Sequence, residues 1–236
     1  MEITYKHYQE AWNNHYAYLT DLIISKNLKK ICEIGGGANP LLPLSFIEEH
    51  QLEYTILDVS AEELAKAPTG YIKILGDITD PEFKLLDKDY DLIFSKMLAE
   101  HIQFGKKFHE NIKQLLKPGG IAFYFFPTLY SIPFMLNKII PESLSIKLLR
   151  LVSKERTGNH GKFPGYYNMC YGPTKNQLRL LQSIGYRIEA YTGFFGHNYF
   201  KNIRLFNWFN KKLTSFLLNH PVPQLTSYSY MLLTKI

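Results

Sequence analysis

The sequence predicts an α/β fold in which helices cover both faces of a mostly parallel β-sheet. Short apolar runs that suit strands alternate with segments of helical periodicity, which is the pattern of strand–helix–strand units. One apolar run, Lys30 to Ile34, passes directly into three glycines, Gly35 to Gly37, and then into a helix start. A chain of 236 residues that is 46% hydrophobic and 15% aromatic can bury a sizeable core, so we expect one domain over residues 1–236.

The junction between this strand and its glycines predicts a nucleotide-type pocket. Ile31, Cys32 and Ile34 suit an interior strand, because a parallel strand covered on both faces is nearly all apolar. Glycine has no Cβ, so the following loop can turn sharply and let a ligand touch bare backbone. The unpaired N–H groups of the loop and of the next helix are available to that ligand.

The residues of the loop show which nucleotide-binding motif the chain carries. A dinucleotide fingerprint needs a third glycine where Pro40 stands, and no Gly-Lys-Ser/Thr triplet follows for a phosphate-binding P-loop. What the chain has is E-x-G-x-G-x-N, formed by Glu33, Gly35, Gly37 and Asn39.

That motif resembles the first motif of class I S-adenosylmethionine (SAM)-dependent methyltransferases. Three later features are similar to the same family: Asp58 ends the second predicted strand (54–57), Asp77 follows the third (71–75), and Lys117 to Gly120 precede a fifth apolar strand (121–126). The resemblance implies a Rossmann-like, seven-stranded, mostly parallel sheet in the order 3-2-1-4-5-7-6. It also implies SAM as the cofactor.

The resemblance further implies roles for individual residues. Asp58 is expected to accept hydrogen bonds from the ribose hydroxyls, while Asp77 accepts from the adenine amino group and Ile78 packs on its ring. The alternative for Asp77 is a helix cap, because Asp77 to Pro81 also reads as a turn and helix start. The cofactor-binding residues expected from the resemblance are Glu33, Gly35, Gly36, Gly37, Asn39, Asp58, Val59, Asp77, Ile78, Ser95, Lys96 and Met97.

The fourth predicted strand, residues 91–94, leads to the candidate catalytic residue. Methyltransferases that act on the amino groups of nucleic-acid bases carry Asp/Asn-Pro-Pro-Tyr/Phe at this place, and this chain has Ser-Lys-Met-Leu, which disfavours N-methylation of bases. Glu100-His101 resembles a turn of small-molecule and lipid members. Imidazole titrates near neutral pH, so His101 is the candidate general base. The alternative is a histidine that packs or orients the loop.

The remaining elements follow from periodicity. Residues 4–27 suit an amphipathic helix that docks on the domain or caps the site, so residues 1–29 are expected to form an N-terminal capping helix. The last strand, 227–235, is expected to insert antiparallel between strands five and six. Further helices are expected at 41–50, 61–67, 108–116 and 174–183, a sixth strand at 185–191, and a basic helix with Leu205, Trp208, Phe209, Leu213, Phe216 and Leu217 along one face.

Residues 127–172 interrupt the family pattern with a helical and loop insertion on the acceptor side. Its apolar first half carries interspersed lysines and arginines, which suits a lid, a dimer face or a peripheral membrane contact. Its second half and the end of strand six supply aromatic and hydrogen-bonding groups. The candidate acceptor-binding residues are His160, Tyr166, Tyr167 and His197.

Charge and composition narrow the remaining choices. The net charge of +6 permits a nucleic-acid partner without requiring one, and we expect none. The chain has two cysteines and no 18-residue apolar stretch, and charged residues interrupt any apolar N-terminal run. We therefore expect no disulfide framework, no transmembrane helix and a cytoplasmic location. No cluster with ligand spacing predicts a metal site.

The function expected from this reading is SAM-dependent methyl transfer, as O-methylation, to a small-molecule, glycan-precursor or lipid-linked acceptor. Two alternatives stay open: an RNA methyltransferase, which the positive charge allows, and a catalytically inactive methyltransferase-like scaffold. The oligomeric state also stays open.

Overall fold

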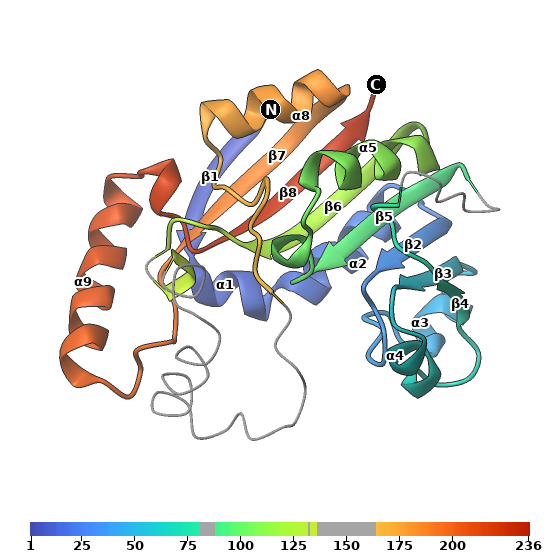
Figure 1. Cartoon of the computed structure of the whole chain (residues 1–236), viewed down its shortest axis with the longest axis horizontal. Helices are drawn as coiled ribbons and strands as arrows, with labels where there is room; N and C mark the ends of the chain where they lie inside the picture. The colour runs from blue at the N-terminus through green and yellow to red at the C-terminus, as the bar shows by residue number, and fades with distance from the viewer. Residues whose placement is uncertain (81–87, 132, 136–163) are drawn as a thin grey trace.

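The computed structural model describes residues 1–80, 88–131, 133–135 and 164–236. They form an eight-stranded sheet in the spatial order β1-β7-β8-β6-β5-β2-β3-β4 (Figure 1). All neighbouring strands are parallel except β8, which runs antiparallel to both β6 and β7. The strands are β1 (Glu2–His7), β2 (Lys30–Ile34), β3 (Glu53–Asp58), β4 (Ile72–Leu75), β5 (Tyr90–Lys96), β6 (Leu116–Pro127), β7 (Tyr186–Phe195) and β8 (Tyr228–Lys235).

The predicted sheet order is confirmed for seven of these strands. The run β4-β3-β2-β5-β6-β8-β7 is the order 3-2-1-4-5-7-6, with the last strand inserted antiparallel. The chain order reverses between β2 and β5, so the carboxyl ends of these strands form the crevice in which α/β folds bind ligands.

The eighth strand, β1, corrects the prediction of a continuous helix over residues 4–27. Residues 2–7 pair in parallel with β7, with Glu2 opposite Ala190 and His7 opposite Phe195. The Thr4 and Thr192 hydroxyls lie 2.9 Å apart, and Tyr5 stacks on Phe195 at 5.5 Å between ring centroids. The helical part begins only at Tyr8.

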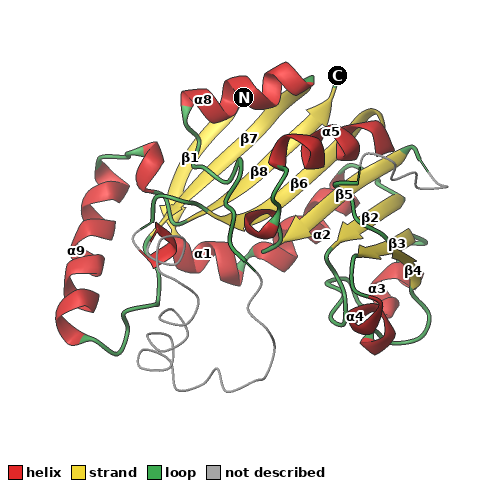
Figure 2. Cartoon of the chain, viewed as in Figure 1, coloured by secondary structure: helices red, strands yellow, loops and turns green. Residues whose placement is uncertain are grey.

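Helices cover both faces of the sheet (Figure 2). His15 and Tyr18 of α2 pack on Phe123 and Tyr230 on one face. His109 of α5 packs on Tyr124, whose side chain points to the opposite face because it follows Phe123 in β6. The helices are α1 (Tyr8–Asn13), α2 (His15–Ser25), α3 (Leu44–Glu49), α4 (Ala61–Lys66), α5 (Gly105–Leu115), α8 (Lys175–Ile184) and α9 (Arg204–Asn219), with 3-10 turns η1 (Ala99–His101) and η2 (Pro223–Leu225). None of these described helices is both long and apolar enough to cross a membrane.

The central strands hold the site rigidly because both of their faces are buried. Every residue of β6 from Ile121 to Pro127 is buried, which explains its unbroken apolar and aromatic run. At the amino ends of the parallel strands, Asp91 of β5 accepts hydrogen bonds from the backbone N–H of Lys29 at 2.7 Å and of Lys30 at 2.8 Å. The same carboxylate forms an ion pair with Lys117. This one carboxylate therefore ties the starts of β2 and β5 together.

Candidate active site

The glycine loop leaves the carboxyl end of β2 in a conformation that glycine favours. Gly35 has φ +78° and Gly37 has φ +41°, both in the left-handed region where a Cβ is strained. The Gly35 N–H donates to the carbonyl of Leu57 at 2.8 Å, and the Asn39 N–H donates to the carbonyl of Gly36 at 3.0 Å. The loop is therefore tied to β3 while it turns toward the next helix.

Close packing gives a second reason for glycine in this loop. A Cβ on Gly36 would lie 2.9 Å from Glu33 Cδ and 3.0 Å from Ile56 Cγ2. A Cβ on Gly37 would lie 3.0 Å from Asp58 Oδ2. Because these side chains are missing, the backbone of the loop lies against the carboxyl groups of Glu33 and Asp58. We call Glu33, Gly35, Gly36, Gly37 and Asp58 the cradle, since their backbone N–H groups and carboxylates suit a polar cofactor.

Glu33 lies beneath the loop and is 4% exposed. Its Oε2 accepts hydrogen bonds from the Leu41 N–H at 3.0 Å and from the Tyr54 hydroxyl. Burial raises the pKa of this carboxyl to about 7, although the hydrogen bonds and the Lys96 ammonium oppose that rise. Glu33 therefore organises the loop, and a cation beside it would stabilise the carboxylate form.

Asp58 and Asp77 follow neighbouring strands and differ in their partners. Asp58 Oδ1 accepts from the Ser60 N–H at 2.9 Å, while Oδ2 faces Gly37. Asp77 is exposed, and its Oδ1 accepts from Thr79 N–H at 2.7 Å and from its hydroxyl at 2.8 Å. The turn-capping alternative for Asp77 is thus present in the structure.

Two neighbours of these acids are placed very differently. Val59 is 62% exposed beside Asp58. Ile78 is buried, and its carbonyl accepts from Asn111 Nδ2 at 2.6 Å, so its side chain is held in the core beside α5.

The carboxyl end of β5 adds a strained turn at the switch point. Met97 has φ +53°, which is costly for a residue with a side chain, and its N–H donates to the Phe125 carbonyl at 2.7 Å. Ser95 is buried, and its Oγ has no hydrogen-bond partner. The Lys96 ammonium lies 6.0 Å from the ring centroid of Trp12.

His101 lies in the 3-10 turn η1 that follows this strand. Its Nδ1 lies 2.9 Å from the Pro164 carbonyl, which can only accept, so this contact requires an N–H at Nδ1. The neutral ring then carries its lone pair on Nε2, which lies 3.7 Å from Glu100 Oε1. Glu100 itself is buried, and burial raises the pKa of its carboxyl to about 8.

The candidate acceptor residues divide into three groups. His160 lies outside the described residues. Tyr166 and Tyr167 pack against η1, because both of their N–H groups donate to the Glu100 carbonyl, at 2.8 and 2.9 Å. His197 is buried after β7 against Tyr199 and Phe200, and burial lowers the pKa of its imidazole to about 4.

The structure also brings together an aromatic wall that sequence reasoning did not identify as a site. Trp12 of α1 contacts Phe125 and Tyr228 edge-on at 5.1 and 5.6 Å between ring centroids, and Lys96 lies over its ring. These residues come from three separate parts of the chain. The sequence predicted that the N-terminal helix could cap the site, and it contains 17 Tyr and 16 Phe, but neither observation says which rings meet.

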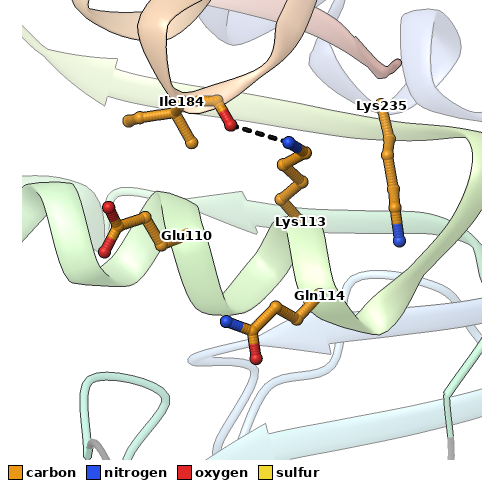
Figure 3. A pocket seen from close by; sticks show the side chains of 5 residues that line it. All are labelled: Glu110, Lys113, Gln114, Ile184 and Lys235. Atoms are coloured by element: carbon orange, nitrogen blue, oxygen red, sulfur yellow. Dashed lines mark hydrogen bonds between the residues drawn. The ribbon is translucent and has the colours of Figure 1, made fainter.

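A surface pocket at the other edge of the sheet has a structural explanation. It is lined by side chains from the ends of α5, α8 and β8 (Figure 3). Lys113 Nζ donates to the carbonyl of Ile184 at 2.8 Å, so a lysine caps the carboxyl end of α8. The pocket lies far from the glycine loop, since β8 runs antiparallel and ends where the parallel strands begin.

The described residues contain no group of three or more His, Cys, Asp or Glu side chains that could hold a metal ion. Cys32 and Cys170 are buried free thiols.

Comparison with known proteins identifies the family. The model of the methyltransferase domain family matches residues 5–193, and the chain belongs to that family, as a class I SAM-dependent methyltransferase. The comparison with curated proteins finds no significant match.

Solved structures agree with the fold. A SAM-dependent methyltransferase from Clostridium acetobutylicum is 13% identical with a TM-score of 0.55, covering 93% of this chain and 90% of that one. One from Archaeoglobus fulgidus is 13% identical with a TM-score of 0.52, covering 97% and 98%. Phosphoethanolamine N-methyltransferase 2 from Haemonchus contortus, in complex with SAM, is 16% identical with a TM-score of 0.53, covering 92% of this chain and 52% of that one.

The chain is therefore an enzyme of the transferase class with SAM as its cofactor. Among the residues predicted for cofactor binding, Glu33 lies against Gly36 and Asp58 lies against Gly37.

Proposed function

We propose that this enzyme transfers the methyl group of SAM to a hydroxyl group of a small-molecule, glycan-precursor or lipid-linked acceptor. The observation that carries the proposal is the contact of the glycine loop with two carboxyls from adjacent strands. Gly37 leaves no room for a side chain beside Asp58 Oδ2, and Glu33 is held under Gly36 by Tyr54 and Leu41.

The residues of this cradle match the chemical groups of the cofactor. The backbone of Gly35 and Gly37 would hold the methionine part, with Glu33 facing its ammonium directly or through water. Asp58 would accept from both ribose hydroxyls, a bidentate arrangement that charge strengthens. Asp77 would accept from the adenine amino group, with Val59 and Asn39 at the edge of the ring, while the Ile78 side chain, which is held in the core, would support this turn from below. Met97, or the backbone of Ser95 and Lys96, would line the space beside the sulfonium.

Protein groups then have to orient the acceptor and remove its proton. When bound, SAM supplies a methyl group that is already activated. The Pro164 carbonyl favours the His101 tautomer with Nε2 unprotonated, and this nitrogen can accept the proton of a hydroxyl group. This contact supports His101 as the general base.

The acceptor site is proposed to lie between η1 and the aromatic wall of Trp12, Phe125 and Tyr228. Tyr166 and Tyr167 are fixed to η1 through their backbone, and His197 extends the polar lining near β7. This aromatic wall suits a flat or sugar-like acceptor, because the face of such a molecule can stack on an aromatic side chain.

Calorimetric titration with SAM and with its demethylated product tests the cofactor site. Asp58→Ala removes a charge-assisted contact, so we expect the dissociation constant to rise about 10- to 100-fold. Asp21→Ala is the matched control, because Asp21 is an exposed carboxylate on α2.

Tight binding that Asp58→Ala leaves unchanged would contradict the proposed cradle. Absence of binding to the folded wild-type protein would favour the scaffold alternative. Once binding is established, loss of turnover in His101→Ala with SAM affinity unchanged is the expected result for a base.

A further inference from the structure

Helix α9 presents its apolar side chains outward. Leu205 is 72% exposed, Trp208 58%, Phe209 53% and Phe216 58%. Their spacing of three, four and seven residues places them on one side of the helix, and we call these four residues the outer face of α9. Surface helices of folded proteins normally turn such a stripe toward the core.

The side of α9 that contacts the protein is instead largely polar. Asn210 Nδ2 donates to the carbonyl of His197 at 2.9 Å. Thr214 is buried, and its Oγ1 lies 2.7 Å from where a Cβ on Gly196 would stand. Leu217 is the buried apolar residue of this side. These contacts fix the rotation of the helix, so the outward direction of the apolar stripe is set by packing.

The charges that α9 and its flanking segments carry have a single sign. Lys201, Arg204, Lys211 and Lys212 lie on α9 or just before it, and residues 190–236 contain no Asp or Glu. α9 stands beside β1 and β7 at the end of the sheet (Figure 1). Among the described residues, the acids on this side are Glu2 of β1 and Glu10 of α1, and Glu10 is already paired with Lys6 at 4.0 Å.

We propose that the outer face of α9 docks this enzyme onto an anionic membrane surface. An interfacial helix needs an apolar face with Trp, Phe and Leu together with flanking Lys and Arg, which meet acyl chains and anionic headgroups respectively. α9 has both features. Trp208 suits the headgroup level, where amphipathic rings are enriched.

The positive charge of α9 favours an anionic lipid surface, rather than a second copy of this chain, as the partner of its outer face. A symmetric dimer through α9 would bring the same four basic residues of each copy together with no acid on α9 itself to offset them, and like charges repel. An anionic bilayer supplies the opposite charge. This docking surface is distinct from the glycine loop, so the inference does not depend on the identity of the acceptor.

Flotation with lipid vesicles tests the proposal on the full chain. We expect wild-type protein to bind phosphatidylcholine vesicles that contain phosphatidylserine, and to bind pure phosphatidylcholine at least tenfold more weakly. Added salt should weaken the binding, because it screens the headgroup charge.

Two comparisons of variants distinguish docking through α9 from an effect of the protein's overall charge or apolar surface. Lys211→Glu/Lys212→Glu should lower vesicle affinity at least tenfold, since each basic residue at an anionic surface contributes roughly fivefold. Lys175→Glu/Arg179→Glu makes the same charge change on the exposed side of α8 and should bind like wild type. Trp208→Ser/Phe209→Ser should also lose binding, whereas Leu180→Ser on α8 should not.

SAM binding reports whether each variant is folded. Equal binding of wild type to both vesicle types overturns the proposal, as does an equal loss in the α8 charge variant. Self-association that rises with protein concentration and disappears in Trp208→Ser/Phe209→Ser, without vesicle binding, would assign the face to a second copy and overturn the membrane proposal.

Discussion

Glu33 and Asp58 end or nearly end neighbouring strands, yet their surroundings give them different chemistry. Glu33 is buried, with its Oε2 engaged by Leu41 N–H and the Tyr54 hydroxyl, so its charge is costly and its pKa is raised to about 7. Asp58 is half-buried and keeps Oδ2 directed at Gly37. The first residue shapes the loop, and the second is the better placed to meet a ligand.

At the same scale, Gly37→Ala should damage the cofactor site more than the fold. The new Cβ would stand 3.0 Å from Asp58 Oδ2 at a residue with φ +41°, so the carboxylate or the loop must shift. We expect SAM affinity to fall at least tenfold, measured by calorimetry. Gly119→Ala is the control, because Gly119 has φ +75° with nothing within 4 Å of its Cβ.

Gly119→Ala should cost only the left-handed strain, about 1–2 kcal/mol of unfolding free energy, with SAM affinity unchanged. Equal SAM affinity in both alanine variants would show that the contact with Asp58 has no role in binding.

At the scale of elements, the first strand shows what periodicity can miss. Tyr5, Tyr8 and Trp12 are spaced as in a helix, and the sequence predicted one helix from residue 4. Residues 2–7 instead pair with β7, 188 positions away along the chain. That pairing supplies backbone hydrogen bonds that local periodicity cannot reveal, and the helix begins where His7 accepts from the Gln9 N–H as its N-cap.

Removing residues 2–6 should expose β7 as a sheet edge. Unpaired edge strands template aggregation, so we expect light scattering to rise on warming well before it does in the full chain. In the truncated chain, Thr192→Lys should restore solubility by placing a charge on the edge, whereas Thr192→Val should not. If the truncated chain stays monomeric by sedimentation, β1 does not protect the edge.

At the scale of the whole molecule, two sets of buried titratable groups act in opposite directions on stability. Burial lowers the pKa of His15 and His109 to about 3 and of His197 to about 4, so the unfolded chain binds more protons below pH 6.5. Burial raises the pKa of Glu33 to about 7 and of Glu100 to about 8, so the folded chain binds more protons above pH 4.5.

The sum of these effects predicts maximum stability near pH 6.5. Below that pH the three histidines outnumber the two carboxyls, and stability rises with pH. Above it the histidines are neutral in both states, and ionising the two buried carboxyls lowers the unfolding free energy by on the order of 2 kcal/mol up to pH 8. Urea unfolding between pH 4.5 and 8.5 measures both limbs.

Glu33→Gln/Glu100→Gln should flatten the limb above pH 6.5 and leave the lower limb rising. A wild-type curve that keeps rising through pH 8, or a double variant with the same upper limb, would contradict the assignment of these two carboxyls.

The sequence motifs by themselves pointed to the family, and the resemblance to that family implied the seven-stranded order. Local patterns also placed Glu33, Gly35, Gly37 and Asp58 at the ends of adjacent strands: a buried apolar strand, glycines at its end, and an acid at the end of its neighbour. The tertiary structure decided what depends on distant partners. It paired β1 with β7, brought Trp12 against Phe125 and Tyr228, and turned the apolar side of α9 outward. Periodicity shows that a helix has an apolar face, but only packing fixes the direction in which that face points.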